Sequence, residues 1–141
     1  MPEVRPERSG WRDERLSNMH RKWGFNCPMV DIDFFVYEYG DNKVAAAIEY
    51  KHENVKRSSI DLTKSNYCTI ADHEEKTSTP FFVVRYKADL TAFNVIPANL
   101  TAKRKLAKER FMKEIEYVKF LYQLRGYECP QSIIDGLKIA V

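Results

Sequence analysis

Two neighbouring segments that favour β-strands, separated by a turn sequence, constrain the fold of this chain more than any other feature. Residues 29–39 and 43–52 are rich in β-branched, aromatic and small apolar side chains, and Gly40, Asp41 and Asn42 lie between them. Glycine and asparagine readily adopt the backbone angles that tight turns need. The pattern predicts a β-hairpin. Because strand side chains alternate between faces, the turn also fixes which residues share a face.

The register of this hairpin gathers charged residues on one face. With a three-residue turn, Asp33 lies opposite Glu49. One step further along the same face, Asp31 lies opposite Lys51. The other face is apolar and predicts a core surface, made of Ile32, Phe34, Val36, Val44, Ala46, Ile48 and Tyr50.

The charged face admits a catalytic interpretation. Two carboxylates placed across a strand pair repel each other unless a cation neutralises them. Carboxylate oxygens suit Mg²⁺ or Mn²⁺, ions that keep several waters and accept a phosphate oxygen as a further ligand. Beside such an ion, Lys51 would hold or help to deprotonate the attacking water, or stabilise charge on the phosphate. These residue types together predict hydrolysis of a phosphodiester bond.

An exposed ion-pair ladder on a solvated hairpin explains the same spacing without any catalysis. Against it, apolar side chains share the charged face toward the turn: Phe35, Tyr37, Ala45 and Ala47. A partly covered face with carboxylates at its end is typical of a pocket. Both interpretations stay open at the level of the sequence.

The remaining segments alternate between helical and extended patterns. Helices are predicted over residues 11–23 and 58–76, and strands over 80–87 and 93–96. A final long helix is predicted over residues 101–126. The element order α-β-β-α-β-β-α predicts an α/β fold in which a small mixed central sheet is flanked by helices.

Length and composition bound the organisation of the chain. It has 141 residues, of which 44% are hydrophobic, the size of one domain with a real core. We therefore expect a single domain over residues 1–141, with its core in residues 11–97 and the helix 101–126 as an addition. The first residues are charged, without an apolar run that would serve as a signal peptide or membrane span. These features predict a cytoplasmic protein without a membrane partner.

Asp33, a hairpin turn and then Glu49-Tyr50-Lys51 resemble the motif of the PD-(D/E)XK nuclease superfamily, whose members have the restriction-endonuclease-like fold. That fold begins with a helix, places the Asp and the Glu-x-Lys on adjacent strands, and adds a helix and a further strand, as the pattern of residues 11–87 does. The resemblance implies a Mg²⁺- or Mn²⁺-dependent endonuclease acting on DNA. Its catalytic residues would be Asp33, Glu49 and Lys51, with the two carboxylates on the metal.

The resemblance suggests further site residues. Asp31 projects from the same face as Asp33 and is the alternative motif aspartate. Many members add an acidic metal ligand from the first helix, and Glu14 is the candidate by position, although it lies almost opposite Leu16 and an exposed ion pair explains it as well. Some members carry a tyrosine on the helix after the motif, which would place Tyr67 in the pocket, unless Tyr67 is a core residue.

Basic residues provide candidate contacts to the phosphates of a nucleic acid. Three lie near the start of the second predicted helix: Lys56, Arg57 and Lys64. Six more lie between positions 103 and 113: Lys103, Arg104, Lys105, Lys108, Arg110 and Lys113. Both groups fit phosphate contacts, and both also fit ordinary solvated helix surfaces. Arg85 interrupts an apolar strand and needs a partner, either a carboxylate or a substrate phosphate.

Two other functions are consistent with the same sequence. The first is a nuclease-fold subunit that binds nucleic acid while cleaving it weakly or not at all. The second is a protein-binding regulatory module that uses exposed aromatic residues such as Trp11, Phe120 and Tyr127. A domain of this size often needs a second copy to cut both strands of a duplex, so the nuclease interpretation also suggests a homodimer.

Overall fold

The computed structural model describes residues 15, 19, 22, 33–38, 40 and 42–139. The chain divides into two compact units, residues 1–31 and 32–141, and the following description concerns the second unit.

Three predictions fall on the first unit. Of the predicted helix 11–23, the structure describes Arg15, Met19 and Lys22, which are helical. The candidate metal ligands Glu14 and Asp31 lie outside the described residues. The expectation of one domain over the whole chain therefore stays a prediction.

A five-stranded mixed sheet forms the centre of the second unit. Its strands lie in the order β1-β2-β3-β4-β5, with β2 and β3 parallel and every other neighbouring pair antiparallel. Their bounds are β1 Phe34–Glu38, β2 Lys43–His52, β3 Phe81–Tyr86, β4 Ala92–Pro97 and β5 Arg110–Lys113. The mixed α/β architecture predicted from the sequence is confirmed at this level.

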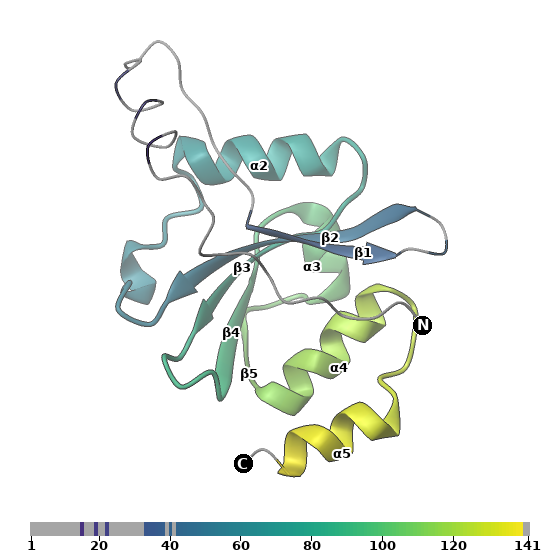
Figure 1. Cartoon of the computed structure of the whole chain (residues 1–141). Coiled ribbons are helices and arrows are strands. Elements are labelled where there is room, and N and C mark those ends of the chain that lie inside the picture. The colour runs from purple at the N-terminus through teal and green to yellow at the C-terminus, as the bar shows by residue number, and fades with distance from the viewer. Residues whose placement is uncertain are drawn as a thin grey trace. The chain divides into compact units, whose positions relative to one another are not determined.

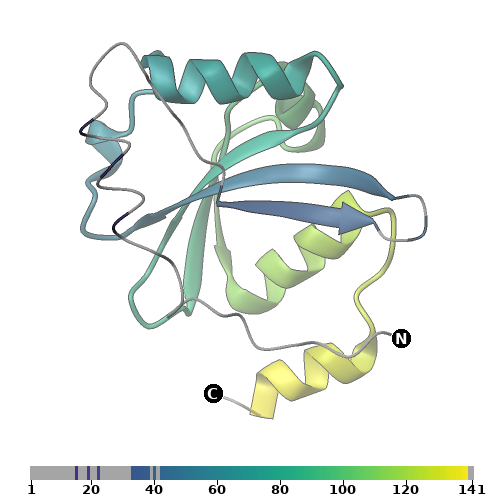
Figure 2. The same cartoon turned by 45° about the horizontal axis from the view of Figure 1, so that its top comes forward.

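Helices pack on both faces of the sheet. The described elements are the short 3₁₀ helix η2 Arg57–Ser59 and the α-helices α2 Ser65–Glu75, α3 Leu100–Lys105, α4 Glu114–Leu124 and α5 Gln131–Ile139. In Figures 1 and 2, α2 lies on one face of the sheet, α4 lies on the other, and α5 follows beside α4. The sheet is therefore the middle layer of three.

The central strand β3 separates two cores. Along FFVV, Phe82 and Val84 pack into the cluster beneath α4, whereas Phe81 and Val83 pack with α2. All four side chains are fully buried. A strand covered on both faces needs apolar residues at every position, so the prediction from the continuous apolar run is confirmed.

The hairpin keeps the predicted register at its open end and loses it at the turn. Phe34 pairs with Ile48 and Phe35 with Ala47, as a three-residue turn requires. Beyond a β-bulge, however, Glu38 pairs with Lys43, so the predicted turn is one residue too short. The Glu38 carboxylate accepts hydrogen bonds from the Gly40 N–H and from Arg125, which holds the longer turn. The extra residue of β2 in the bulge restores the register toward the open end.

The single helix predicted over residues 101–126 is wrong. Helix α3 ends at Lys105, Leu106 is extended, and β5 pairs with β4 before α4 begins at Glu114. The strand provides hydrogen-bond partners for backbone groups of β4 that a helix would leave unpaired. It also directs Met112 into the core and Phe111 outward, whereas a helix over residues 101–126 would set Phe111 on one face with Ala107, Ile115 and Val118.

Candidate functional site

The candidate residues lie near the ends of neighbouring strands, at one end of the sheet. On the parallel pair β2 and β3, Glu49 is in register with Val83 and Lys51 with Arg85. Asp33 directly precedes β1, and continuing the observed pairing of Phe34 with Ile48 sets it opposite Glu49. In open α/β sheets, ligands bind outside the carboxyl ends of parallel strands. The candidate residues lie at such an end.

Glu49 and Lys51 form an ion pair on the sheet face covered by α2. Ala47, two residues earlier on the same face, packs in the cluster that includes Tyr67 of that helix. The Lys51 Nζ lies 3.6 Å from Glu49 Oε1, and the two side chains are 28% and 14% exposed. A carboxylate so far removed from water requires a cation or hydrogen-bond donors close by. Lys51 is the cation that meets this requirement in the described residues.

Tyr67 contacts the lysine as well as the core. Its ring is buried, and Lys51 Nζ lies 5.7 Å from the ring centroid. An ammonium over an aromatic face is held by the ring quadrupole. The two alternatives for Tyr67, pocket residue and core residue, therefore describe the same side chain: its ring packs in the core and one face of it positions Lys51.

Asp33 is held by the backbone of the neighbouring strand. Its Oδ2 accepts a hydrogen bond of 2.9 Å from the N–H of Tyr50, and the residue is exposed. Tyr50 stands between Glu49 and Lys51 in β2, so this bond ties the aspartate to the strand that carries both other residues. The structure thus brings Asp33, Glu49 and Lys51 to one end of one hairpin.

A tyrosine pair, buried at Tyr117 and half-buried at Tyr50, supports this end of the sheet from the opposite face. The hydroxyls of Tyr50 and Tyr117 lie 2.6 Å apart, which joins β2 to α4. Burial raises the pKa of both phenols, and the nearby Asp33 carboxylate raises the pKa of Tyr50 further. Both hydroxyls therefore stay protonated at neutral pH. The pair fixes the backbone of Tyr50, whose N–H holds Asp33.

The donor set suits a hard divalent cation. Asp33 and Glu49 supply carboxylate oxygens, the ligands that Mg²⁺ and Mn²⁺ prefer, and Mg²⁺ is commonly bound through one or two carboxylates plus waters and substrate phosphate. No cluster of three or more His, Cys, Asp or Glu side chains able to hold a metal was found among the described residues. Any metal at this end of the hairpin would therefore rest on two described carboxylates, water and substrate.

Two of the predicted phosphate-binding arginines are engaged within the protein. Arg85 donates hydrogen bonds of 2.6 Å to the carbonyl oxygens of Val55 and Glu53 and so fastens the loop that follows β2. Arg57 pairs with Glu109 at 2.7 Å and also donates to the carbonyl of Ile60. Both guanidinium groups stabilise connections around the site.

The predicted lysines and the last arginine are placed differently. Lys56 and Lys64 are exposed in the segment between β2 and α2, on the chain that leaves the candidate site. Lys103 and Arg104 are exposed in the last turn of α3, which follows β4. Hydrogen bonds from Thr101 and the charge of Arg104 lower the pKa of Glu75. The structure therefore divides the predicted basic contacts between two regions.

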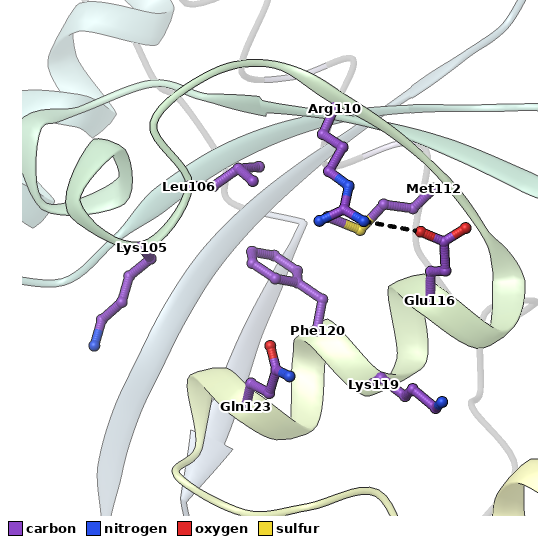
Figure 3. A pocket seen from close by; sticks show the side chains of 8 residues that line it. All are labelled: Lys105, Leu106, Arg110, Met112, Glu116, Lys119, Phe120 and Gln123. Atoms are coloured by element: carbon purple, nitrogen blue, oxygen red, sulfur yellow. Dashed lines mark hydrogen bonds and ion pairs between the residues drawn. The ribbon is translucent and has the colours of Figure 1, made fainter.

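A hollow with a basic rim lies among α3, β5 and α4 (Figure 3). Its volume is about 240 Å³, and it is lined by Lys105, Leu106, Arg110, Met112, Glu116, Lys119, Phe120 and Gln123. Arg110 pairs with Glu116 at 3.2 Å across its rim. The sequence did not indicate this hollow. Lys119 comes close to Lys105 and Arg110 only because β5 interrupts the predicted helix and α4 then packs beside it.

The aromatic residues of the protein-binding alternative have separate environments. Phe120 packs edge to face on Phe82, 5.3 Å between ring centroids, and belongs partly to the core. Tyr127 is exposed, with Arg125 over its ring. Trp11 lies outside the described residues. The two aromatic residues that are described do not form a common aromatic surface by these contacts.

Comparisons with protein-family models, curated proteins and solved structures gave no match for this chain. Among the described residues, no helix has the length and apolar character needed to cross a membrane.

Proposed function

We propose that this protein is a metal-dependent nuclease that hydrolyses phosphodiester bonds in DNA. The observation that carries the proposal is the convergence of Asp33, Glu49 and Lys51 at one end of the β1–β2 hairpin, beside the carboxyl end of β3. These residues have the order and spacing of the PD-(D/E)XK motif. Within the proposal, the fold is restriction-endonuclease-like and the protein acts in the cytoplasm.

Asp33 and Glu49 are the proposed ligands of Mg²⁺ or Mn²⁺. Bound there, such an ion would supply Lewis-acid activation of water and polarisation of the phosphodiester. The two carboxylates would neutralise part of its charge, and the Tyr50 N–H orients Asp33 through Oδ2. The site residues thus hold their positions through backbone interactions of the sheet.

Lys51 acts on the reacting groups. Its ammonium lies beside the Glu49 carboxylate and over the Tyr67 ring, where it would donate a hydrogen bond to the attacking water or to a phosphate oxygen. In the reaction, the water oxygen bonds to phosphorus and the bond to one sugar oxygen breaks. One proton leaves the water for solvent, and the leaving oxygen takes up a proton.

Exposed basic residues contribute to DNA binding in this proposal. Lys56 and Lys64 are exposed between β2 and α2, and Lys103 and Arg104 lie on α3. Lysine and arginine side chains of this kind neutralise phosphates without reading sequence. A homodimer would allow both strands of a duplex to be cut.

The test is cleavage of supercoiled plasmid and of single-stranded DNA in Mg²⁺, Mn²⁺ or EDTA. Wild type is compared with Glu49→Ala and Lys51→Ala, and with matched surface controls Glu128→Ala and Lys138→Ala, whose side chains are exposed away from the site. We expect metal-dependent cutting that falls at least about a hundredfold in both site variants and is unchanged in both controls. Wild type that cuts neither substrate with either metal would contradict the proposal and favour the accessory or protein-binding alternatives.

A further inference from the structure

The edge strand β1 carries exposed aromatic side chains on the same face as Asp33. Phe35 pairs with Ala47, which faces α2, and side chains at alternate positions of a strand share a face. Phe35 and Tyr37 therefore project to one side, the side to which strand alternation also assigns Asp33, directly before β1. Phe35 is 49% exposed and Tyr37 is 51% exposed, which leaves half of each large side chain in water.

The neighbouring aromatic on the other face of β1 is used differently. Phe34 packs edge to face against Tyr50, with 5.4 Å between ring centroids. Within the part of the chain that the structure describes, neither Phe35 nor Tyr37 has a ring contact, and Tyr37 donates its hydroxyl proton to Asn42 at the turn. The two rings on the Asp33 side thus present surface that internal packing does not explain.

The spacing of these rings fits successive bases of an extended nucleic acid strand. Residues two apart in a strand are separated by about 6.8 Å, so Phe35 lies one such step from Asp33 and Tyr37 lies two. Unpaired bases stack on exposed aromatic rings, with an effect of roughly 5- to 150-fold in affinity per base. In a duplex, each base already stacks on its neighbours and offers no face to a protein ring.

The charge of this edge points to the same ligand. The charged side chain within β1 is Glu38, which is buried and paired with Arg125. β1 itself offers aromatic rings and no exposed charge, so the phosphates of a duplex or of a single strand gain little from this strand. Bases that can stack gain more from it.

On these grounds we infer that the substrate is single-stranded DNA whose bases stack on Phe35 and Tyr37 while a neighbouring phosphate lies at Asp33 and Glu49. This inference rests on the proposed nuclease function and names its substrate class. Phe35, one step from the aspartate, is the principal stacking residue. Tyr37 extends the platform toward the turn.

To test the inference that single-stranded DNA is the substrate, DNA binding and DNA cleavage are measured separately. The full-length protein is titrated, in EDTA, with a fluorescein-labelled oligothymidylate and with a labelled duplex of the same length. Variants are Phe35→Ala, Phe35→Leu and Phe35→Tyr, with Phe111→Ala as the matched control because Phe111 is an exposed aromatic on the opposite edge strand. Thermal melts and light scattering report folding and oligomeric state for each variant.

We expect wild type to bind the single strand more tightly than the duplex. Phe35→Ala and Phe35→Leu should each weaken single-strand binding roughly tenfold, whereas Phe35→Tyr and Phe111→Ala should leave it unchanged. Leucine keeps the apolar surface but removes the aromatic face, so its loss of binding identifies stacking. Duplex binding should be unaffected in all four variants.

Several results would overturn the inference. Equal affinity for duplex and single strand would do so, as would full binding by Phe35→Leu. A dimer that becomes monomeric in Phe35→Ala would assign this edge to a second copy of the chain. Cleavage that needs Glu49 but acts on duplex alone would reject stacking and keep the nuclease. Binding that depends on Phe35 without any cleavage would reject the nuclease and keep stacking.

Discussion

The two edges of the sheet differ in what they expose. Strand β1 presents Phe35 and Tyr37 beside the carboxylate of Asp33, whereas β5 presents Arg110 and Lys113 next to the basic helix α3. Both edge strands of the described sheet have exposed side chains, and of the two it is β1 that adjoins the parallel strand pair β2–β3 through its hairpin. Under the proposed function, this difference assigns cleavage and base contacts to the β1 side and phosphate contacts to the β5 side. We call this assignment the proposed division.

The largest expected effect concerns chemistry at the β1 side. Glu49→Gln should lower the metal-dependent cleavage rate by about 10²- to 10³-fold, because it removes a charged metal ligand. DNA binding measured in EDTA should be retained. The matched control is Glu116→Gln, a carboxylate at the β5 side that pairs with Arg110. Equal loss of cleavage in both variants would break the proposed division.

The second prediction tests whether residues 110–113 form the edge strand β5 and not part of a continuous helix. Met112 is buried at 2% exposure and Phe111 is 59% exposed. Met112→Ala should therefore reduce the free energy of unfolding by about 2–5 kcal/mol, and Phe111→Ala by less than about 0.5 kcal/mol. Urea denaturation measures both. The reverse order would restore the continuous helix that the sequence pattern indicated.

A smaller effect concerns the basic side. Reversing charge in the double variant Lys103→Glu, Arg104→Glu should weaken DNA binding and reduce the slope of log affinity against log salt by about 1 for each phosphate contact removed. Phe35→Ala should leave this slope unchanged, since stacking releases no counterions. Lys138→Glu provides a control on α5. Fluorescence anisotropy at several salt concentrations separates the two kinds of contact.

The smallest effect is a pH dependence of the β5 edge. The hydrogen bond from Arg57, followed by that from Asn94, lowers the pKa of Glu109 in the folded protein. A lowered folded pKa means that the contribution to stability is present above the usual glutamate pKa and is lost as pH falls through the folded value. Because the pair is partly exposed, we expect less than about 1 kcal/mol.

Unfolding of wild type and Glu109→Gln, compared from neutral pH into the acid range, checks this sign. The difference in unfolding free energy between the two proteins should be largest at neutral pH and should shrink on acidification. A difference that grows as pH falls would contradict the assignment of Glu109 as a stabilising carboxylate.

The hairpin could be predicted because its signals are local. Alternating side chains and a Gly-Asp-Asn turn are read from neighbouring residues, and they set Asp33 and Glu49 on one face. The turn length was wrong, because Glu38 takes part in an ion pair with Arg125, far away in the sequence. That contact is visible only once α4 is packed against the sheet.

The C-terminal region could not be predicted for a related reason. Ala107, Phe111, Ile115 and Val118 recur at helical spacing, so the pattern alone favours one helix. What decides the structure is the edge of β4, whose backbone pairs with β5 and whose register places Phe93 beside Met112. Tertiary pairing of this kind overrides a local helical pattern.

The bulge in β2 also bears on how this hairpin tolerates change. The register differs by one residue between the two sides of the bulge, so Phe34 and Ile48 pair as a three-residue turn requires although the turn itself is one residue longer. We therefore expect an insertion at the turn to disturb Asp33 and Glu49 less than an insertion within β2 between the bulge and Glu49. The tip of the hairpin is therefore a suitable place for a grafted peptide or a fluorescent label that leaves the opposite end undisturbed.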